Sequence, residues 1–233
     1  MRREMIAFGA VAALAATHTG VAGATSVTIN KVNGTVMSTT GLTGFATNGA
    51  QMAGMSIQVN FSNSTSETGI WATTGAVSGA ASGTGWSVAE SGDTFLSTWT
   101  LRNTSGLGID SVVFNGGIGD TLFDTTFGGL FGTAGSARGL DFAVVSGLTG
   151  LDIAATYSEA VAIGAAAPVG DIFNTLTVDF STLGVAFGTG RSLVFRQDTD
   201  NLKFAGDLNV VPLPTAAMLG VFGLSVIARR RRF

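Results

Sequence analysis

The sequence contains no cysteine, and its one histidine, His18, lies within the first 24 residues. A chain without cysteine forms no disulfides, so an exported protein of this composition depends on a hydrophobic core or bound ions for stability. Without histidine or cysteine in the rest of the chain, Ser-His-Asp and Cys-His catalysis and the usual zinc and copper sites are excluded. Carboxylates, two lysines (Lys31 and Lys203) and one tyrosine, Tyr157, are what remains for chemistry.

Charged residues are also scarce, at 12% of the chain, and they are unevenly placed. The formal net charge is −3, but residues 1–24 and 210–233 together hold six of the 12 basic residues and only one of the 15 acidic residues. The central part is therefore acidic, at about −8, and has no basic patch. This charge balance argues against a nucleic-acid partner.

The first 24 residues have the order of a secretory signal peptide. Arg2 and Arg3 form a basic start, residues 5–16 form an apolar run, and the small residues Ala22 and Ala24 follow. The apolar run is too short to span a bilayer, so a signal peptide is favoured over a membrane anchor. We expect export, with cleavage after Ala24.

Between residues 25 and 209 the sequence alternates between apolar and polar positions. Ile57, Val59 and Phe61 share one face of segment 56–62, and segment 171–180 alternates in a similar way. Strict alternation over this length predicts half-buried antiparallel strands. Further strands are predicted at 27–31, 95–101, 109–114, 140–145, 153–163 and 193–196, with a hairpin that joins 86–89 to 94–101 through a turn at 90–93.

The fold class follows from these many short strands and their polar turns. We predict an all-β protein, an antiparallel β-sandwich of the jelly-roll or immunoglobulin-like kind. Segment 68–85 is rich in small residues and is compatible with either a loop or a pair of small-residue strands. Segment 125–137 is predicted to be a long loop. The predicted organisation is a signal peptide at 1–24, a sandwich at 25–209 and a C-terminal tail at 210–233.

The tail combines three features in order. Val211, Pro212, Leu213 and Pro214 precede an apolar stretch that ends at residue 228, and a run of arginines follows: Arg229, Arg230, Arg231 and Arg232. Counted from Val210, the apolar stretch is near the minimum length for a transmembrane helix. The arginines predict that the tail end stays inside and the folded domain lies outside the inner membrane.

This tail resembles a PEP-CTERM sorting signal, and more closely the variant named for a Val-Pro-Leu-Pro-Ala motif, with Thr215 in the place of alanine. Segment 195–204 is also similar to the stretch that often precedes such tails. The resemblance implies processing by exosortase, a membrane-embedded enzyme, in bacteria that make extracellular polysaccharide. It implies an exported protein. The missing histidine and cysteine, the absence of a catalytic motif and the low charge favour a structural or adhesive role at the cell surface or in the matrix over catalysis.

Three kinds of candidate site remain in the central domain. Asp198 and Asp200 share one face of an extended strand with Asn201 adjacent, which could form part of a calcium site or be only an acidic turn. Trp71 and Trp86, expected to be exposed, could stack against sugar rings, which would make the domain a carbohydrate-binding module for extracellular polysaccharide. Paired carboxylates would be needed for the less favoured alternative, a glycoside hydrolase, with candidates Asp110, Asp120, Asp124, Asp141 and Asp152. Trp99 is expected in the core.

Overall fold

The structure, a computed structural model, describes residues 26–211 apart from 44–45, 127–131, 134–135, 137, 165 and 182–183. The predicted signal peptide with Ala22 and Ala24, the sorting residues Pro212 to Pro214, and the four terminal arginines lie outside the described residues. Strands dominate the part that is described, with two short 3-10 turns, η1 (Gly49–Met52) and η2 (Gly117–Gly119). No helix within these residues is long and apolar enough to cross a membrane.

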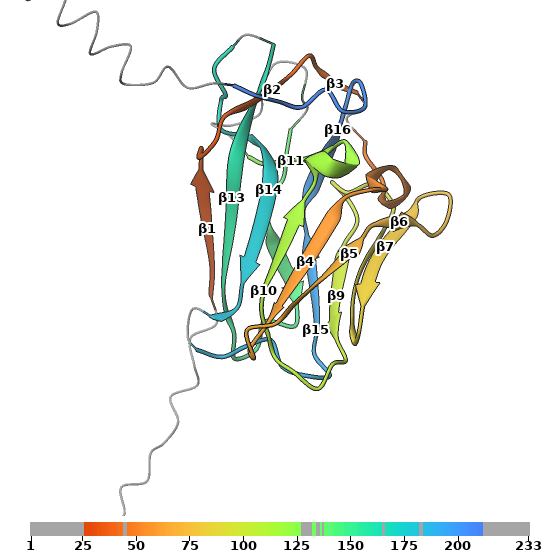
Figure 1. The fold of residues 1–233 in the computed structure, drawn as a ribbon, viewed down its shortest axis with the longest axis vertical. Coiled ribbons are helices and arrows are strands. Elements are labelled where there is room, and N and C mark those ends of the chain that lie inside the picture. Colours follow the sequence, from red (N-terminus) through yellow and green to blue (C-terminus); the bar gives the residue numbers. More distant parts are fainter. Residues whose placement is uncertain are drawn as a thin grey trace, which may run out of the picture.

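The larger of the two sheets has seven strands in its main path (Figure 1). Their order is β17 (Asn209–Val210), β2 (Met37–Thr39), β13 (Asp152–Ile163), β14 (Ile172–Asp179), β10 (Ile109–Asn115), β4 (Ser56–Phe61) and β5 (Ser66–Ile70). Four strands branch from this path: β1 (Ser26–Val32), β3 (Leu42–Thr43), β11 (Thr121–Asp124) and β16 (Asp198–Leu202). Most pairs are antiparallel, but β1 and β2 both run parallel to β13.

The smaller sheet has six strands and is entirely antiparallel. Their order is β12 (Ala143–Ser146), β15 (Ser192–Arg196), β9 (Trp99–Asn103), β8 (Trp86–Ser91), β7 (Ser78–Gly83) and β6 (Ala72–Thr73). Segment 68–85, for which a loop and a strand pair were both open, therefore forms strands. Its small residues belong to β5, β6 and β7.

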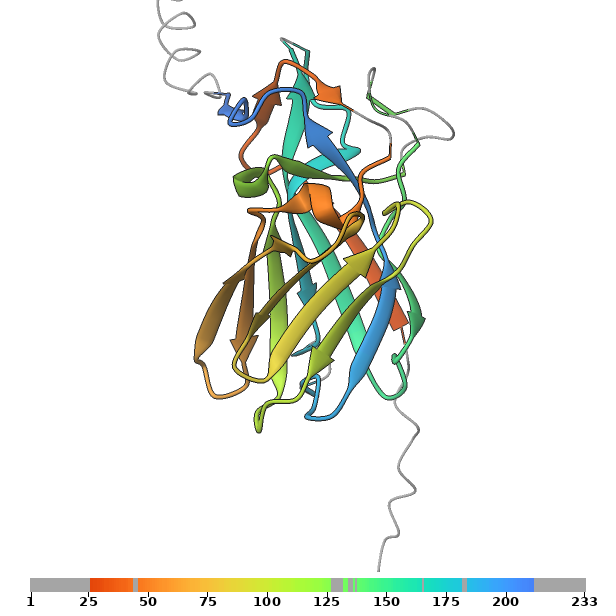
Figure 2. The ribbon, with the colours of Figure 1, turned by 90° about the vertical axis from the view of Figure 1, so that its right-hand side faces the viewer.

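The two sheets face each other, as the view in Figure 2 shows. Residues from both contribute to one hydrophobic cluster, with Val59 and Phe114 from the larger sheet and Val88, Leu101 and Phe195 from the smaller one. Burial of the apolar faces of two amphipathic sheets against each other is the dominant stabilising contribution in this architecture. The predicted all-β sandwich is confirmed at this level.

The expected hairpin at 86–101 is wrong in its turn and in the start of its second strand. β8 extends to Ser91, and β9 begins only at Trp99, so residues 92–98 form a longer connection. Asp93 causes this, because its carbonyl accepts from Leu96 and Ser97, and its Oδ1 accepts from the Phe95 amide at 3.0 Å. An aspartate side chain that accepts a hydrogen bond from the backbone amide two residues later favours a turn over a strand. Trp99 is nevertheless in the core, as predicted, at 1% exposed.

The two ends of the described chain lie at opposite ends of the sandwich (Figures 1 and 2). β1 begins at Ser26 at the lower end, and β17 leads to Val211 at the upper end, beside β2. The Val211 amide donates to the Val36 carbonyl at 2.8 Å, which fixes the point where the chain leaves the sheet. Val210, the first residue of the predicted tail, is therefore still paired in the domain.

Candidate functional site

The most unusual buried group is a set of carboxylates on the β11–β16 ladder. In the antiparallel register, Asp124 lies opposite Asp198, and Leu122 lies opposite Asp200. Because side chains alternate along a strand, all four point to one face. Asp124, Asp198 and Asp200 are 1%, 4% and 2% exposed. Like charges directly opposite each other in a sheet are destabilising, so this arrangement differs from ordinary strand pairing.

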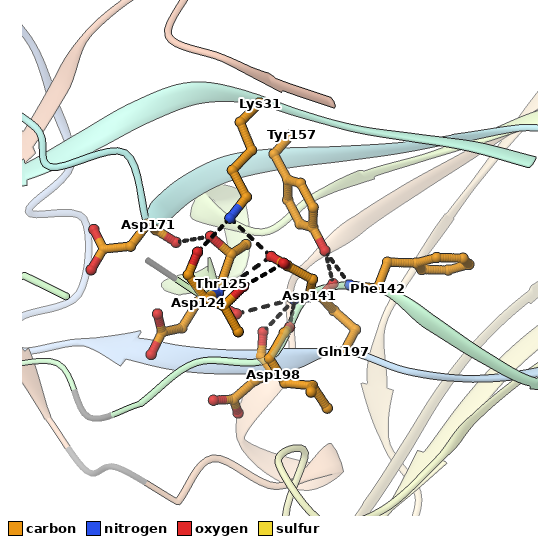
Figure 3. Close-up of polar contacts among 11 residues, drawn as sticks. Lys31, Asp124, Thr125, Asp141, Phe142, Tyr157, Asp171, Gln197 and Asp198 are labelled. Carbon is orange, nitrogen blue, oxygen red and sulfur yellow. Dashed lines mark hydrogen bonds and ion pairs between the residues drawn. The ribbon is translucent and has the colours of Figure 1, made fainter. Parts of the chain in front are cut away.

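Thr133 and Ser136 supply hydroxyl groups to the buried carboxylates. Ser136 Oγ lies 2.7 Å from Asp124 Oδ2 and 2.8 Å from Asp200 Oδ2. Thr133 binds a further buried carboxylate, Asp171, through its amide and its hydroxyl. Figure 3 shows the carboxylates of Asp124, Asp171 and Asp198 directed to the same side. Acidic residues distant in sequence thus lie together beside Thr133 and Ser136.

A hydroxyl group has one hydrogen, and this limits the charge state of the cluster. Ser136 can donate to only one of these two carboxylate oxygens at a time, so a proton on one of the two carboxyl groups would allow both contacts to be hydrogen bonds. Asp124 is the better candidate for the proton, because its Oδ1 is buried with no hydrogen-bond partner among the described residues. An ionised oxygen in that position would carry the full cost of desolvation.

Burial and mutual repulsion raise the pKa values of these groups. Burial is the largest cause for each, and it raises the pKa of Asp124 to about 8, of Asp198 to about 7 and of Asp200 to about 6. The charge of Asp200 is the next cause for Asp124 and for Asp198. Near neutral pH the cluster therefore holds protons that isolated aspartates would have lost.

Oxygen atoms at such density also raise the question of a metal ion. Asp198 and Asp200 do share a face of a strand, as predicted, but this strand is buried in the sandwich and is not an exposed turn. Asn201 points to the other face, where it donates to the Gln51 carbonyl and its Oδ1 accepts from Thr47, so it does not join the two aspartates. Across the described residues no three acidic or histidine side chains are arranged to hold a metal. Calcium binding at Asp198 and Asp200 stays a prediction.

Tyr157 and Gln197 form a hydrogen-bond network beside the carboxylate cluster (Figure 3). The Tyr157 hydroxyl accepts from the Phe142 amide at 2.6 Å and donates to Gln197 Oε1. Gln197 Nε2 donates to the Asp198 carbonyl at 2.8 Å. Burial raises the pKa of Tyr157, which is fully buried and stays neutral. The single tyrosine therefore holds segments together and is not placed as a proton donor to a substrate.

Among the glycosidase candidates, Asp120 and Asp152 are engaged elsewhere in the fold. Asp141 instead lies beside the Asp124 cluster (Figure 3). Asp152 accepts from the Ser26 amide at the start of β1, and Asp141 pairs with Lys31 at 2.9 Å. Asp120 accepts from the Gly206 amide, near η2. A glycosidase needs two carboxyl groups open to its substrate, whereas Asp124 is buried.

The expectation that Trp71 and Trp86 are exposed is wrong. They are 1% and 2% exposed, because their rings lie inside the sandwich. Trp71 Nε1 donates to the Gly49 carbonyl at 2.7 Å, and Trp86 Nε1 donates to Glu67 Oε2 at 2.9 Å. A buried indole needs such an acceptor. In this arrangement neither ring offers a face on which a sugar could stack.

Glycines make room for these indoles. A Cβ atom added to Gly79 would lie 2.0 Å from Trp71 Nε1, and one added to Gly83 would lie 2.3 Å from Trp86 Nε1. At Gly69 it would lie 2.8 Å from the outer edge of the Trp86 ring. The small residues of segment 68–85 thus serve the packing of two large side chains.

Two hollows lined by described residues lie outside the cluster and have room for a ligand. A shallow groove of about 330 Å³ on the smaller sheet is lined by hydroxyl side chains, among them Thr74, Ser91 and Thr100. A second hollow, of about 240 Å³, lies at the upper end between η2, β2 and the chain that leads to β17. No family model, curated protein or solved structure matches this chain.

Local spacing along the chain identifies some residues of the buried carboxylate cluster and misses others. Asp198 and Asp200 were visible through their spacing, but Ser136, Asp171 and Gln197 were not, because nothing local marks them. They come to the cluster through strand pairing between segments far apart in sequence. Asp124 was visible only as one acidic residue among several.

Proposed function

We propose that this protein is an exported, non-catalytic module of the cell surface or extracellular matrix, with a structural or adhesive role. A signal peptide at residues 1–24 would export it, and the PEP-CTERM-like tail of the VPLPA type would carry it to an exosortase-type enzyme in the inner membrane. The jelly-roll or immunoglobulin-like class of the sandwich is part of this proposal.

One observation carries the proposal furthest: the chain leaves the sandwich at the end opposite the one where β1 begins (Figure 1). A domain tethered through Val211 would direct its other end away from the membrane. That outer end consists of the turns after β4, β7 and β9 and the segment between β14 and β15. It is rich in serine, threonine, asparagine and glycine, which suits a surface facing water or polysaccharide.

The loops of the outer end are held together by a buried side chain. Asn103 is 0% exposed, and its Nδ2 donates to the carbonyls of Leu107 at 2.8 Å and Phe187 at 2.7 Å. Its Oδ1 accepts from the amide and hydroxyl of Ser105. Thr189 then donates to the Ser105 carbonyl. A preorganised set of loops loses little conformational entropy when it binds, as an adhesive surface requires.

Labelling of intact cells tests display. Because the chain has no cysteine, Leu107→Cys introduces a single thiol at the outer end. We expect a membrane-impermeant maleimide to label it on intact producing cells, whereas the matched variant Val88→Cys, buried in the core, should be labelled only after denaturation. Labelling of Leu107→Cys only after the cells are broken would contradict surface display.

A further inference from the structure

The upper end of the sandwich carries apolar side chains that are exposed, as at Ile118 and Val210, or only partly buried, as at Met37 and Leu208. Val210 on β17 pairs with Met37 on β2, so their side chains share a face. Leu208 lies two residues before Val210 and lines the 240 Å³ hollow together with Met37 and Ile118. Ile118 and Val210 are 64% and 59% exposed. We call these four residues the upper apolar patch.

The turn that precedes Leu208 carries a further exposed apolar side chain. Phe204 is 59% exposed, and Lys203 Nζ lies 5.6 Å from the centre of its ring. The nearby carboxylates are engaged within the chain, since Asp207 accepts from Thr39 and Asp120 accepts from the Gly206 amide. An aromatic ring beside a lysine is a combination expected at a membrane interface.

The length of chain beyond Val211 limits how far this end can lie from a bilayer. Residues 216–228, as a helix, would be about 20 Å long, which is shorter than the hydrocarbon core of about 30 Å. Residues 211–215, even fully extended, add about 17 Å. With the arginines at 229–232 held on the inner side, Val210 must lie at or within the outer headgroup layer.

We propose that, before the tail is processed, the upper apolar patch and Phe204 lie in the headgroup region of the membrane. This inference rests on the proposed function, because it requires the tail to insert. In this arrangement the domain contacts the bilayer through one defined surface. That contact would place the Val211–Pro214 motif at the membrane boundary. Docking of the lipid surface would cover side chains that otherwise contact water.

Depth-dependent fluorescence quenching tests the proposal. The chain from residue 25 to 233 with the single substitution Ile118→Cys would carry an NBD label and be reconstituted in vesicles of phosphatidylcholine and phosphatidylglycerol. The matched control is Leu107→Cys, at the opposite end of the sandwich, and Phe204→Cys is a second probe. We expect lipids with a nitroxide headgroup to quench the labels at 118 and 204 several-fold more than the label at 107.

Flotation of the vesicles separates the possible failures. If the protein floats with the vesicles but position 118 is quenched no more than position 107, the tail inserts and the docking proposal is overturned. Blue-shifted emission at position 118 without quenching by lipid would mean that protein, either the tail or a second copy, covers the patch, which also overturns it. If the protein does not float at all, the tail does not insert, and both this inference and the proposed function fail.

Discussion

Two regions of the same sandwich shift the pKa values of their carboxyl groups in opposite directions. In the tryptophan region, Glu67 accepts from the Thr84 amide at 2.8 Å and from Trp86 Nε1, and these bonds lower the pKa of Glu67. In the carboxylate cluster, burial and the neighbouring aspartate raise the pKa of Asp124 to about 8. The main difference is burial: the Glu67 carboxylate is partly exposed and accepts from N–H groups, whereas Asp124 is buried, and burial favours the neutral form.

The comparison suggests a division of roles. The tryptophan region, around Trp71, Trp86 and Trp99, has large side chains, matched glycines and bonded indole N–H groups, so it should contribute stability mainly through packing. A pH-dependent contribution within this region comes from Glu90, which is buried opposite Trp99. The carboxylate cluster should provide stability that depends on protonation. Substitutions in each region can therefore separate packing from charge, and the predictions below run from the largest expected loss of stability on substitution to the smallest.

Truncation of a buried indole should have the largest effect. Trp71→Ala removes a ring that packs 5.1 Å from the Trp99 ring, and it leaves the Gly49 carbonyl without its donor. We expect a loss of about 3–5 kcal/mol in the free energy of unfolding, measured by urea denaturation. Leu96→Ala, at a side chain that is 67% exposed, is the control and should change it by less than about 0.5 kcal/mol. Similar losses in both variants would contradict a core role for Trp71.

Adding one methyl group beside the same indole should have the next largest effect. In Gly79→Ala the new Cβ would lie 2.0 Å from Trp71 Nε1 and 2.2 Å from the Gly49 carbonyl oxygen, and the second atom is backbone. We expect a loss of about 2–3 kcal/mol from overpacking. Gly106→Ala, where a Cβ would contact no atom within 4 Å, is the matched control. Equal denaturation midpoints for the two variants would show that the glycine is not required for packing.

The carboxylate cluster should make stability depend on pH. Its pKa values are higher in the folded state, so the folded protein holds protons that the unfolded chain releases. The linkage relation then requires the free energy of unfolding to fall as pH rises, from about 4, near the pKa of unfolded aspartate, to about 8. Thermal unfolding measured across this range should show the decline.

Asp124→Asn should reduce that decline by replacing the protonated acid with a neutral group of the same shape. By the linkage relation, we expect its stabilising effect to be larger at pH 8 than at pH 5 by roughly 3–4 kcal/mol. Part of the decline should remain, because burial also raises the pKa of Glu90 to about 7. Asp110→Asn is the control. A profile for Asp124→Asn that runs parallel to that of the unsubstituted protein would contradict the assignment of the proton to Asp124.

The smallest effect is expected at the ion pair beside the cluster. Lys31 and Asp141 are 27% and 31% exposed, so water screens their attraction. Lys31→Met should lower the free energy of unfolding by less than about 1 kcal/mol, and this loss should decrease further at high salt. A larger, salt-independent loss would mean that the lysine stabilises the buried carboxylates as well.

The sequence was most informative where local patterns decide the structure. Alternation located β4, β10, β13 and β14 to within about two residues, because half-buried strands require it. It failed at Phe95, where the turn formed by Asp93 overrides an apolar pattern. The exposure of Trp71 and Trp86 could not be read either, since the glycines beside them look like loop residues until strand pairing shows what they contact.

For the carboxylate cluster, too, local sequence patterns were informative and long-range contacts were not visible. The spacing of Asp198 and Asp200 was visible along the chain, but their partners Asp124 and Ser136 come from other segments through long-range pairing. Asn201 was adjacent in sequence yet lies on the opposite face of the strand. Sequence neighbours of a strand residue are therefore poor guides to its neighbours in space.

The central claim is that this sandwich is exported and released or retained through its tail, and the intact mass of the protein from producing cells tests it most directly. The account predicts a mass that lacks residues 1–24 and everything beyond about Pro214, in the medium or on the cell surface. A membrane-bound protein whose mass retains Arg229 to Phe233 would contradict processing of the tail and would indicate a simple single-span anchor.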